Sequence, residues 1–198
     1  MSVTATLDPL ATVVAGTHYL FLAPLGTALP TDCPAPGGNP GDGLNAAFAH
    51  IGYTADSGAA FAVDTQTQDL YASQSNDPIR TIVQSKKATI QAPLIEWSGA
   101  SLIAAFGGGT LTDTANGTKY VPPAAGVLDE VTAVLDIVDG SEFIRLVVER
   151  GLVAGSVSAT LVKNAFASLP IVLTALAPVT QPTAWHLIGS NTAFATAS

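Results

Sequence analysis

Along most of the chain, apolar and polar residues alternate with a period of two, which is the pattern of a β-strand with one buried face. The alternation is cleanest over residues 128–139. We therefore predict a strand there whose two faces differ in character. One face carries Val131, Ala133, Leu135 and Ile137, and the other carries Glu130, Thr132, Val134 and Asp136.

The same pattern predicts further strands over residues 61–71, 79–95, 143–150, 157–162, 171–176 and 185–188. The second of these is long enough to bend or bulge near Lys86 and Lys87. Many strands separated by turn signals indicate a mainly β fold, either a β-sandwich or an open barrel. In the first strand, one face carries Phe61, Val63 and Tyr71, and the other carries Asp64, Gln66 and Gln68.

Two segments near the N-terminus depart from this pattern. Residues 1–20 are rich in Thr, Ala and Val with weak alternation, and we expect an extended N-terminal arm or an edge strand. Residues 30–43 hold four prolines and four glycines, a composition that excludes a helix or a central strand. We expect a long exposed loop there, and loops of that length are usually functional.

One short helix is predicted over residues 98–106. Ser98 can cap its N-terminus, and Gly107 can end it. Leu102, Ile103 and Phe106 form an apolar stripe at helical spacing that should pack on one end or face of the strands.

Charged residues make up 11% of the chain, and residues 9–31 and 164–198 hold none. A soluble domain carries charge on about a quarter of its positions. Cores of protein interfaces are depleted of charge in the same way. Two classes fit this composition: a subunit that is covered by copies or partners, and an ordinary β domain with a Thr-, Ser- and Gly-rich surface.

The remaining composition excludes several functions. The net charge is −8, and seven scattered Lys and Arg residues cannot neutralise nucleic-acid phosphates. No Lys or Arg precedes Arg80, so a secretory signal is not expected, and prolines interrupt both uncharged runs, so neither is expected to span a membrane. The single cysteine, Cys33, cannot form an internal disulfide. We expect a protein made and kept in a cytoplasm.

No catalytic, cofactor-binding or metal site is expected. The chain lacks the common nucleophile, zinc-protease and phosphate-loop motifs. Its three histidines, His18, His50 and His186, are far apart in sequence. Calcium ligation by Asp32, Asn39 and Asp42 is an alternative to solvated turn residues, but their spacing is not that of an EF-hand.

A series of motifs resembles one protein family. Residues 23–30 (APLGTALP) and 44–58 (LNAAFAHIGYTADSG) are similar to the N-terminal signature of major tail (tail tube) proteins of long-tailed, non-contractile bacteriophages, particularly those of actinobacterial hosts. The sequence ADSG stands where that family has a more acidic "sedG". Residues 79–81, 94–97 and 106–108, and later 136–140, 145–151 and 169–173, follow the family pattern in order over residues 14–176.

The resemblance implies a β-sandwich with one helix that forms hexameric rings. The rings would stack into a tube, with strands of each subunit joining an inner β-barrel through which DNA leaves the virion. Implied partners are copies of the chain itself, the tape measure protein, the tail tip or baseplate and the tail terminator. Double-stranded viral DNA would pass the acidic, lysine-poor lumen without specific binding, and no membrane or cofactor is implied. The expected location is the tail of the virion, after synthesis in the host cytoplasm.

The resemblance also guides the expected organisation: a single tail-tube domain over residues 1–198, with C-terminal strands and a tail over 169–198 and without an additional immunoglobulin-like domain. We hypothesise that one of two polar faces lines the channel, carrying either Asp64, Gln66 and Gln68 or Glu130, Thr132 and Asp136. We assign ring stacking to residues 1–20 and to the 30–43 loop, with Pro30, Asp32, Pro36, Gly38, Pro40 and Asp42 as its candidate residues. Alternatives are another tail component, such as a tail terminator or the inner tube of a contractile tail, or a β-sandwich that binds glycans.

Overall fold

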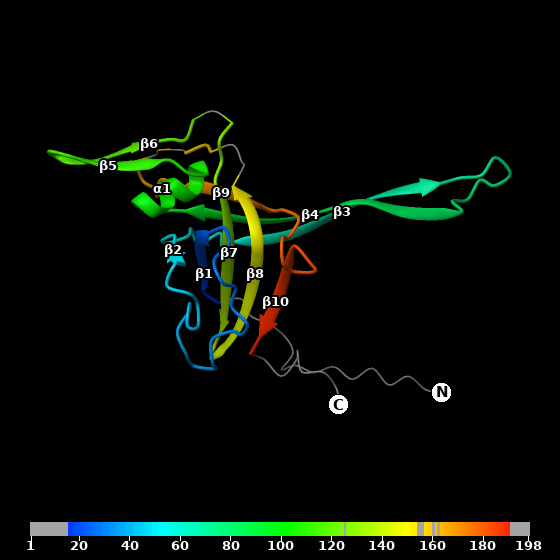
Figure 1. Cartoon of the computed structure of the whole chain (residues 1–198), viewed down its shortest axis with the longest axis horizontal. Coiled ribbons are helices and arrows are strands. Elements are labelled where there is room, and N and C mark those ends of the chain that lie inside the picture. The colour runs from blue at the N-terminus through cyan, green and yellow to red at the C-terminus, as the bar shows by residue number, and fades with distance from the viewer. Residues whose placement is uncertain (1–15, 125, 154–156, 160, 162, 191–198) are drawn as a thin grey trace.

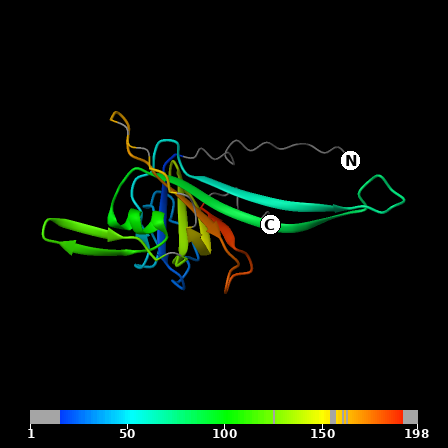
Figure 2. The same cartoon turned by 90° about the horizontal axis from the view of Figure 1, so that it is seen from above.

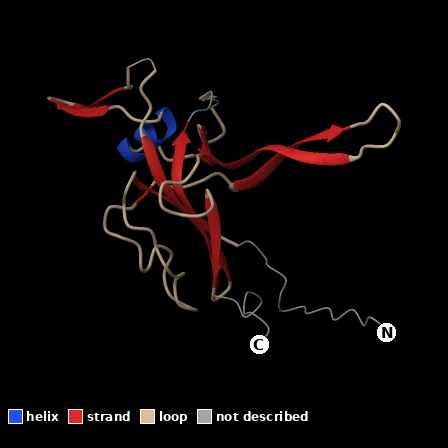
Figure 3. Cartoon of the chain, turned by 45° about the vertical axis from the view of Figure 1, so that its right-hand side comes forward, coloured by secondary structure: helices blue, strands red, loops and turns tan. Residues whose placement is uncertain are grey.

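The computed structural model describes residues 16–124, 126–153, 157–159, 161 and 163–190. Within these residues the chain forms ten strands and one helix (Figure 1). Figure 3 shows how strongly strands dominate the fold. The elements in chain order are β1 (His18–Pro24), β2 (Ala49–His50), β3 (Ala60–Leu70), β4 (Arg80–Leu94), α1 (Gly99–Phe106), β5 (Thr110–Thr114), β6 (Gly117–Val121), β7 (Glu130–Asp139), β8 (Glu142–Val153), β9 (Leu169–Ala175) and β10 (Trp185–Gly189).

Eight strands form one antiparallel sheet in the order β2-β1-β7-β8-β9-β4-β3, with β10 also paired to β8. The first half of β8 pairs with β10, and its last three residues pair with β9. The strands β7 and β8 run across the direction of β3 and β4, so the sheet curves over its own inner face (Figure 1). Strands β5 and β6 form a separate hairpin beside α1.

The hydrophobic core lies on the inner face of this curved sheet. Alternate residues of five strands supply it, as the period of two predicts, and Ala133 and Leu135 of β7 are both buried there. Val131 and Ile137 pack against its margin. The sequence therefore predicted the inner face of β7 correctly. The largest other contributors are Leu20, Leu22, Ile51, Ile90, Leu94, Leu146, Val148, Leu169, Ile171 and Leu173.

The helix has the predicted ends, and Leu102 packs against the core as expected, but its fully buried residues are not those of the predicted stripe. The Ser98 hydroxyl accepts a hydrogen bond from the Ser101 N–H at 3.2 Å, and the Ser101 hydroxyl accepts one from the Ser98 N–H at 2.7 Å. Gly107 ends the helix at φ 67°, a left-handed conformation that favours glycine. The buried residues are Ser101, Ala104 and Ala105. The expectation that Phe106 packs inward is wrong, because small residues let the helix approach the sheet closely and leave Phe106 37% exposed.

Several boundaries differ from expectation. Residues 157–159 and 161 are not in a strand, so the described part of the predicted 157–162 strand is wrong. The irregularity in β4 falls at Gln84, two residues before Lys86, because Gln66 pairs with Ser85 while Thr67 pairs with Val83. Most of the proposed N-terminal arm lies outside the described residues, and its last three residues, 18–20, belong to β1.

The β5–β6 hairpin was not predicted. Its residues are almost all exposed, so it lacks the apolar alternation that marked the other strands. In the described part of the chain, no helix combines the length and the apolar character that a membrane crossing requires.

Candidate functional site

The most prominent surface feature is the hairpin of β3 and β4, which extends far beyond the body (Figures 1 and 2). We call its outer part, residues 63–87, the arm. All arm residues of β3 are exposed. In β4 every arm residue is exposed except Ile82, which is partly buried. An isolated two-stranded ribbon is marginally stable in water, and it needs a packing partner. Among the described residues, the arm has no packing partner beyond its own two strands.

The two faces of the arm differ. Asp64, Gln66 and Gln68 share one exposed face, as predicted. Hydrogen bonds join neighbours along this face, from Gln66 to Asp64 at 3.1 Å and from Gln84 to Gln68 at 2.6 Å. Lys87 stands directly opposite Asp64 in the ladder. The face is therefore rich in amides and balanced in charge, which differs from the acidic, lysine-poor surface expected of the lumen.

The opposite face of the arm continues the hydrophobic core outward. Phe61 packs edge-on against Trp185, with ring centroids 4.9 Å apart, and Ile90 beside it is buried. Further out, Val63 and Val83 lie on the same face and are exposed. Thr65 and Lys86 lie between the two valines on this face, so the apolar surface that begins in the core continues into solvent as separate patches.

The second predicted polar face lies on β7, and it is largely covered. Thr132 and Asp136 are 1% and 0% exposed, so the expectation that they line a channel is wrong. The alternation of β7 correctly grouped them on one face. The alternation could not show that the segment after β1 folds back over this face of β7.

Glu130, the third member of this face, remains partly exposed beside Arg150. Two hydrogen bonds of 2.6 Å join the guanidinium to the carboxylate. The hydrogen bond from Arg150 lowers the pKa of Glu130, and the same contact raises the pKa of Arg150.

The covering segment is held by a buried ion pair. Arg145 of β8 stands opposite Asp136 in the β7–β8 ladder, and its Nε lies 2.7 Å from Asp136 Oδ1. The same guanidinium donates from Nη1 to the Asp32 carbonyl at 2.8 Å and from Nη2 to the Asp42 carbonyl at 3.0 Å. The Gly41 N–H donates to Asp136 Oδ2 at 2.8 Å. Three hydrogen bonds thus fasten both ends of the proline- and glycine-rich loop to the sheet.

This network changes the interpretation of the 30–43 loop. The loop lacks helix and strand, as expected, but it packs on its own subunit, and the expectation of a wholly exposed loop is wrong. Gly41 lies directly against the Phe21 ring, where an added Cβ would come within 2.9 Å of a ring carbon. Of the candidate stacking residues, Pro30 is buried, Gly38 and Pro40 are intermediate, and Asp32, Pro36 and Asp42 are exposed.

Sequence reasoning missed Arg145 as an anchor, although a signal was present. In a hairpin turning at Gly140 and Ser141, residues equally distant from the turn stand opposite each other, and this rule pairs Asp136 with Arg145. An arginine within an otherwise apolar strand, opposite an aspartate, indicates a buried ion pair.

A second buried carboxylate fastens the segment before β10. Glu149 is 8% exposed and accepts hydrogen bonds from the Thr180 N–H and hydroxyl, both at 2.8 Å, and from the Gln181 N–H at 2.9 Å. Burial by itself would raise the pKa of Glu149, but these donors outweigh it and leave the pKa below its usual value.

The histidines do not form a site. The His18 Nε2 lies 2.7 Å from the Thr54 hydroxyl, and the His50 ring contacts the Tyr19 and Phe21 rings. Burial lowers the pKa of both His18 and His50, in the latter case against the opposing effect of Glu96. Among the described residues, no three His, Cys, Asp or Glu side chains are placed to hold a metal ion.

Cys33 lies in the 30–43 loop and is partly buried. Burial raises the pKa of its thiol, and the neighbouring Asp32 adds to this. The thiol is therefore less ionised than an ordinary cysteine, which fits a structural position in the loop.

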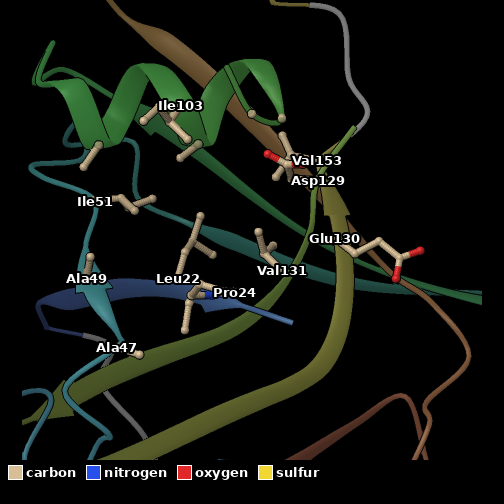
Figure 4. Close-up of a pocket in the computed structure, with 15 residues that line it drawn as sticks. Leu22, Pro24, Ala47, Ala49, Ile51, Ile103, Asp129, Glu130, Val131 and Val153 are labelled. Carbon is tan, nitrogen blue, oxygen red and sulfur yellow. The ribbon is translucent and has the colours of Figure 1, made fainter. Parts of the chain in front are cut away.

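An apolar groove of about 470 Å³ lies between α1 and the strands β1 and β7 (Figure 4). We call it the α1 groove. Ile51, Leu22 and Val131 form its floor, and Ile103 points into it from the helix. The remaining lining residues are Ala23, Pro24, Ala47, Ala49, Ala100, Ala104, Gly107, Gly108, Val153 and the two carboxylates Asp129 and Glu130.

Comparison with known proteins gives a consistent result. A family model described as phage tail tube protein matches residues 5–198. Among solved structures, a chain from the "Virion of native gene transfer agent (GTA) particle" is similar, with a TM-score of 0.41 and 11% identity over 74% of this chain and 91% of that chain. No curated protein matches the sequence.

Proposed function

Because the chain belongs to the phage tail tube protein family, we propose that its copies form hexameric rings that stack into a tube through which DNA leaves the virion. The protein is a structural component of the virion tail. In this proposal it acts by assembly and without catalysis. Its proposed partners are other copies of itself, the tape measure protein, and the tail tip and terminator proteins at the two ends of the tube.

The observation that carries this proposal is the β3–β4 arm. Its residues pack on no other part of the described chain, and its apolar face continues the core into solvent through Val63 and Val83. Burying such patches is the main driving force of protein association. Pairing or packing between copies would also protect the exposed strand edges, which otherwise invite uncontrolled aggregation.

The amide-rich face of the arm is our proposed channel lining. Duplex DNA carries one charge per ~1.7 Å of its axis, so a lining with many free cations would bind it tightly. Here Lys87 is balanced by Asp64, and Gln66 and Gln68 are neutral. Such a surface offers DNA no fixed charge to hold it, which suits passage without specific binding.

The buried loop anchor supports a further part of the proposal. Arg145 presents residues 30–43 in one conformation, with Pro36 and Asp42 exposed at its surface. We propose that this preformed surface contacts the next ring. A loop ordered before contact loses less conformational entropy on stacking than a flexible one.

Negative-stain electron microscopy of the purified protein at rising concentration tests the proposal. We expect rings with six-fold symmetry and hollow tubes. A matched variant replaces residues 67–84 with an Asn-Gly turn, so that Gln66 and Ser85, which pair in the native ladder, flank the turn and the base keeps its register. We expect this variant to fold and to remain monomeric. A control shortens the β5–β6 hairpin by replacing residues 113–118 with an Asn-Gly turn between the paired Thr112 and Lys119.

The outcomes separate the alternatives. Full-length protein that stays monomeric at all concentrations, even when offered preformed tail tips, would refute the tail tube assignment. Single rings that never elongate would instead favour a tail terminator. Normal tubes from the arm-shortened variant would show that the arm does not carry assembly.

A further inference from the structure

We propose that the tip of the β3–β4 arm of one copy docks in the α1 groove of a neighbouring copy, with Arg80 facing Asp129. This inference rests on the proposed self-assembly and names the two surfaces that meet. The arm tip is defined by Leu70, Tyr71, Ile79 and Arg80, which flank the turn between β3 and β4.

The arm tip is an apolar cluster that carries the cation Arg80 near the outer end of the hairpin, and the turn beyond it carries Asp77. Leu70 and Arg80 stand opposite each other at the end of the ladder, and the Ile79 N–H donates to the Leu70 carbonyl at 2.9 Å. Tyr71 and Ile79 are 62% and 66% exposed. These side chains contribute nothing to the core of their own subunit, so their apolar character requires another explanation.

The α1 groove offers the complementary chemistry. Its floor and helix wall are apolar, through Leu22, Ile51 and Ile103. Its volume of about 470 Å³ lies within the ~300–1,000 Å³ range of pockets that enclose small groups of atoms. Two carboxylates line the groove among the described residues. Glu130 is paired with Arg150, so the exposed Asp129 is the one that an incoming cation can contact.

The two surfaces lie on opposite sides of the molecule. The arm leaves the body on one side, and α1, β1 and β2 lie on the other (Figures 1 and 2). The arm therefore cannot reach the groove of its own subunit. From Val63 to Leu70 the arm spans roughly 25 Å at ~3.3 Å per residue, which is enough to reach across to a neighbour. A tip-to-groove contact joins different surfaces, so it propagates from copy to copy and closes a ring when the rotation fits.

The distribution of charge favours the same contact. The segment that contains the arm, residues 60–94, holds three basic and three acidic residues, so the rest of the chain carries the whole net charge of −8. Two of the four cations outside it, Arg145 and Arg150, are engaged in ion pairs. A charge-balanced arm can approach an acidic body where two bodies would repel each other. The basic residues of the segment are Arg80, Lys86 and Lys87, and the acidic residues are Asp64, Asp69 and Asp77.

The N-terminal residues 1–15 are the competing occupant. They contain apolar residues, but their only charged side chain is Asp8, which would face Asp129 with the same sign. The arm tip is therefore the better match for this groove.

A charge swap tests the proposed pair. We expect Arg80→Glu and Asp129→Arg each to raise the concentration required for polymerisation by roughly tenfold, since like charges placed together cost at least ~1.4 kcal/mol. The double variant should restore polymerisation, because it recreates the pair with reversed polarity. Lys119→Glu, on β6, and Asp113→Arg, on β5, lie outside both surfaces; they are the matched controls and should polymerise nearly as the unaltered protein does.

Cross-linking provides an independent measurement. In a Cys33→Ser background, Ile79→Cys and Ala47→Cys should give a ladder of covalent multimers with a short bis-maleimide once the protein assembles. Ile79→Cys with Thr112→Cys should not. Each variant should keep the melting temperature of the Cys33→Ser background, because Ala47, Ile79 and Thr112 are all exposed.

Each outcome decides between the hypotheses. Tubes without the ladder, or tubes from both single charge variants at unchanged concentration, would overturn the tip-to-groove contact and leave the tail tube function intact. Cross-linking of Ala47→Cys to a cysteine within residues 1–15, and not to Ile79→Cys, would assign the groove to the N-terminal segment and also overturn it. Failure of the unaltered protein to form any ring would count against the proposed function itself.

Discussion

Arg145→Met should destabilise the subunit severely, because it leaves the Asp136 carboxylate buried without its partner. Both side chains are 0% exposed, and Arg145 donates to both Asp136 oxygens and to the carbonyls of Asp32 and Asp42. Removing one partner of a buried ion pair costs about 3–5 kcal/mol. In a domain of this size each kcal/mol lowers the melting temperature by ~2–4 °C, so we expect a decrease of roughly 6–20 °C.

The chain contains its own control for this prediction. Arg150 and Glu130 form a pair of the same chemistry between the same two strands, but its side chains are 32% and 30% exposed. Water can solvate Glu130 when its partner is removed, so Arg150→Met should change the melting temperature little. The contrast between the two variants isolates the effect of burial from that of the pairing itself.

Two measurements check the prediction: thermal unfolding followed by circular dichroism, and limited proteolysis of the 30–43 loop. Arg145→Met should make this loop cleavable below the melting transition, since two of its carbonyls lose their donor. The double variant with Asp136→Met should recover only part of the stability, because the Gly41 N–H also loses its acceptor, at about 1–3 kcal/mol. Equal, small shifts in the Arg145 and Arg150 variants, with an uncleaved loop, would refute the reasoning.

Three further predictions concern pH, the helix and the channel. Burial lowers the pKa of His18 and His50 below 6.5, so protonation favours the unfolded chain and stability falls as the pH drops through that value. The melting temperature should decrease from about pH 7.5 to about pH 5.5, and the double His→Gln variant should flatten this dependence; an unchanged slope would contradict it. Ser98→Ala should lower the free energy of unfolding by about 0.5–2 kcal/mol in urea titrations, because it removes the helix cap, and an unchanged midpoint would show that the cap is dispensable. Lysines at Asp64 and Gln66 should leave tubes intact but slow DNA release from virions, and unchanged release kinetics would reject this face as the channel lining.

Local patterns in the sequence predicted those elements whose formation depends on nearby residues. Ala133 and Leu135 were assigned to the inner face of β7 because side chains in a strand alternate strictly. The helix ends were predicted from Ser98 and Gly107, because capping involves only residues within one turn. The order of the motifs along the chain likewise indicated the tail tube family, and the family match over residues 5–198 confirms this assignment.

Only the tertiary structure decided which polar faces reach solvent. Alternation grouped Thr132 with Asp136 correctly, but their burial depends on a loop about 100 residues earlier in the chain and on Arg145 in the next strand. The same limit applies to the β3–β4 arm. The sequence predicted two strands, but it could not show that Val63 and Val83 extend past the body, since this depends on how far the neighbouring strand β9 runs. A period of two establishes which side chains share a face, whereas covering that face requires contacts between segments distant in sequence, and those contacts exist only in the folded chain.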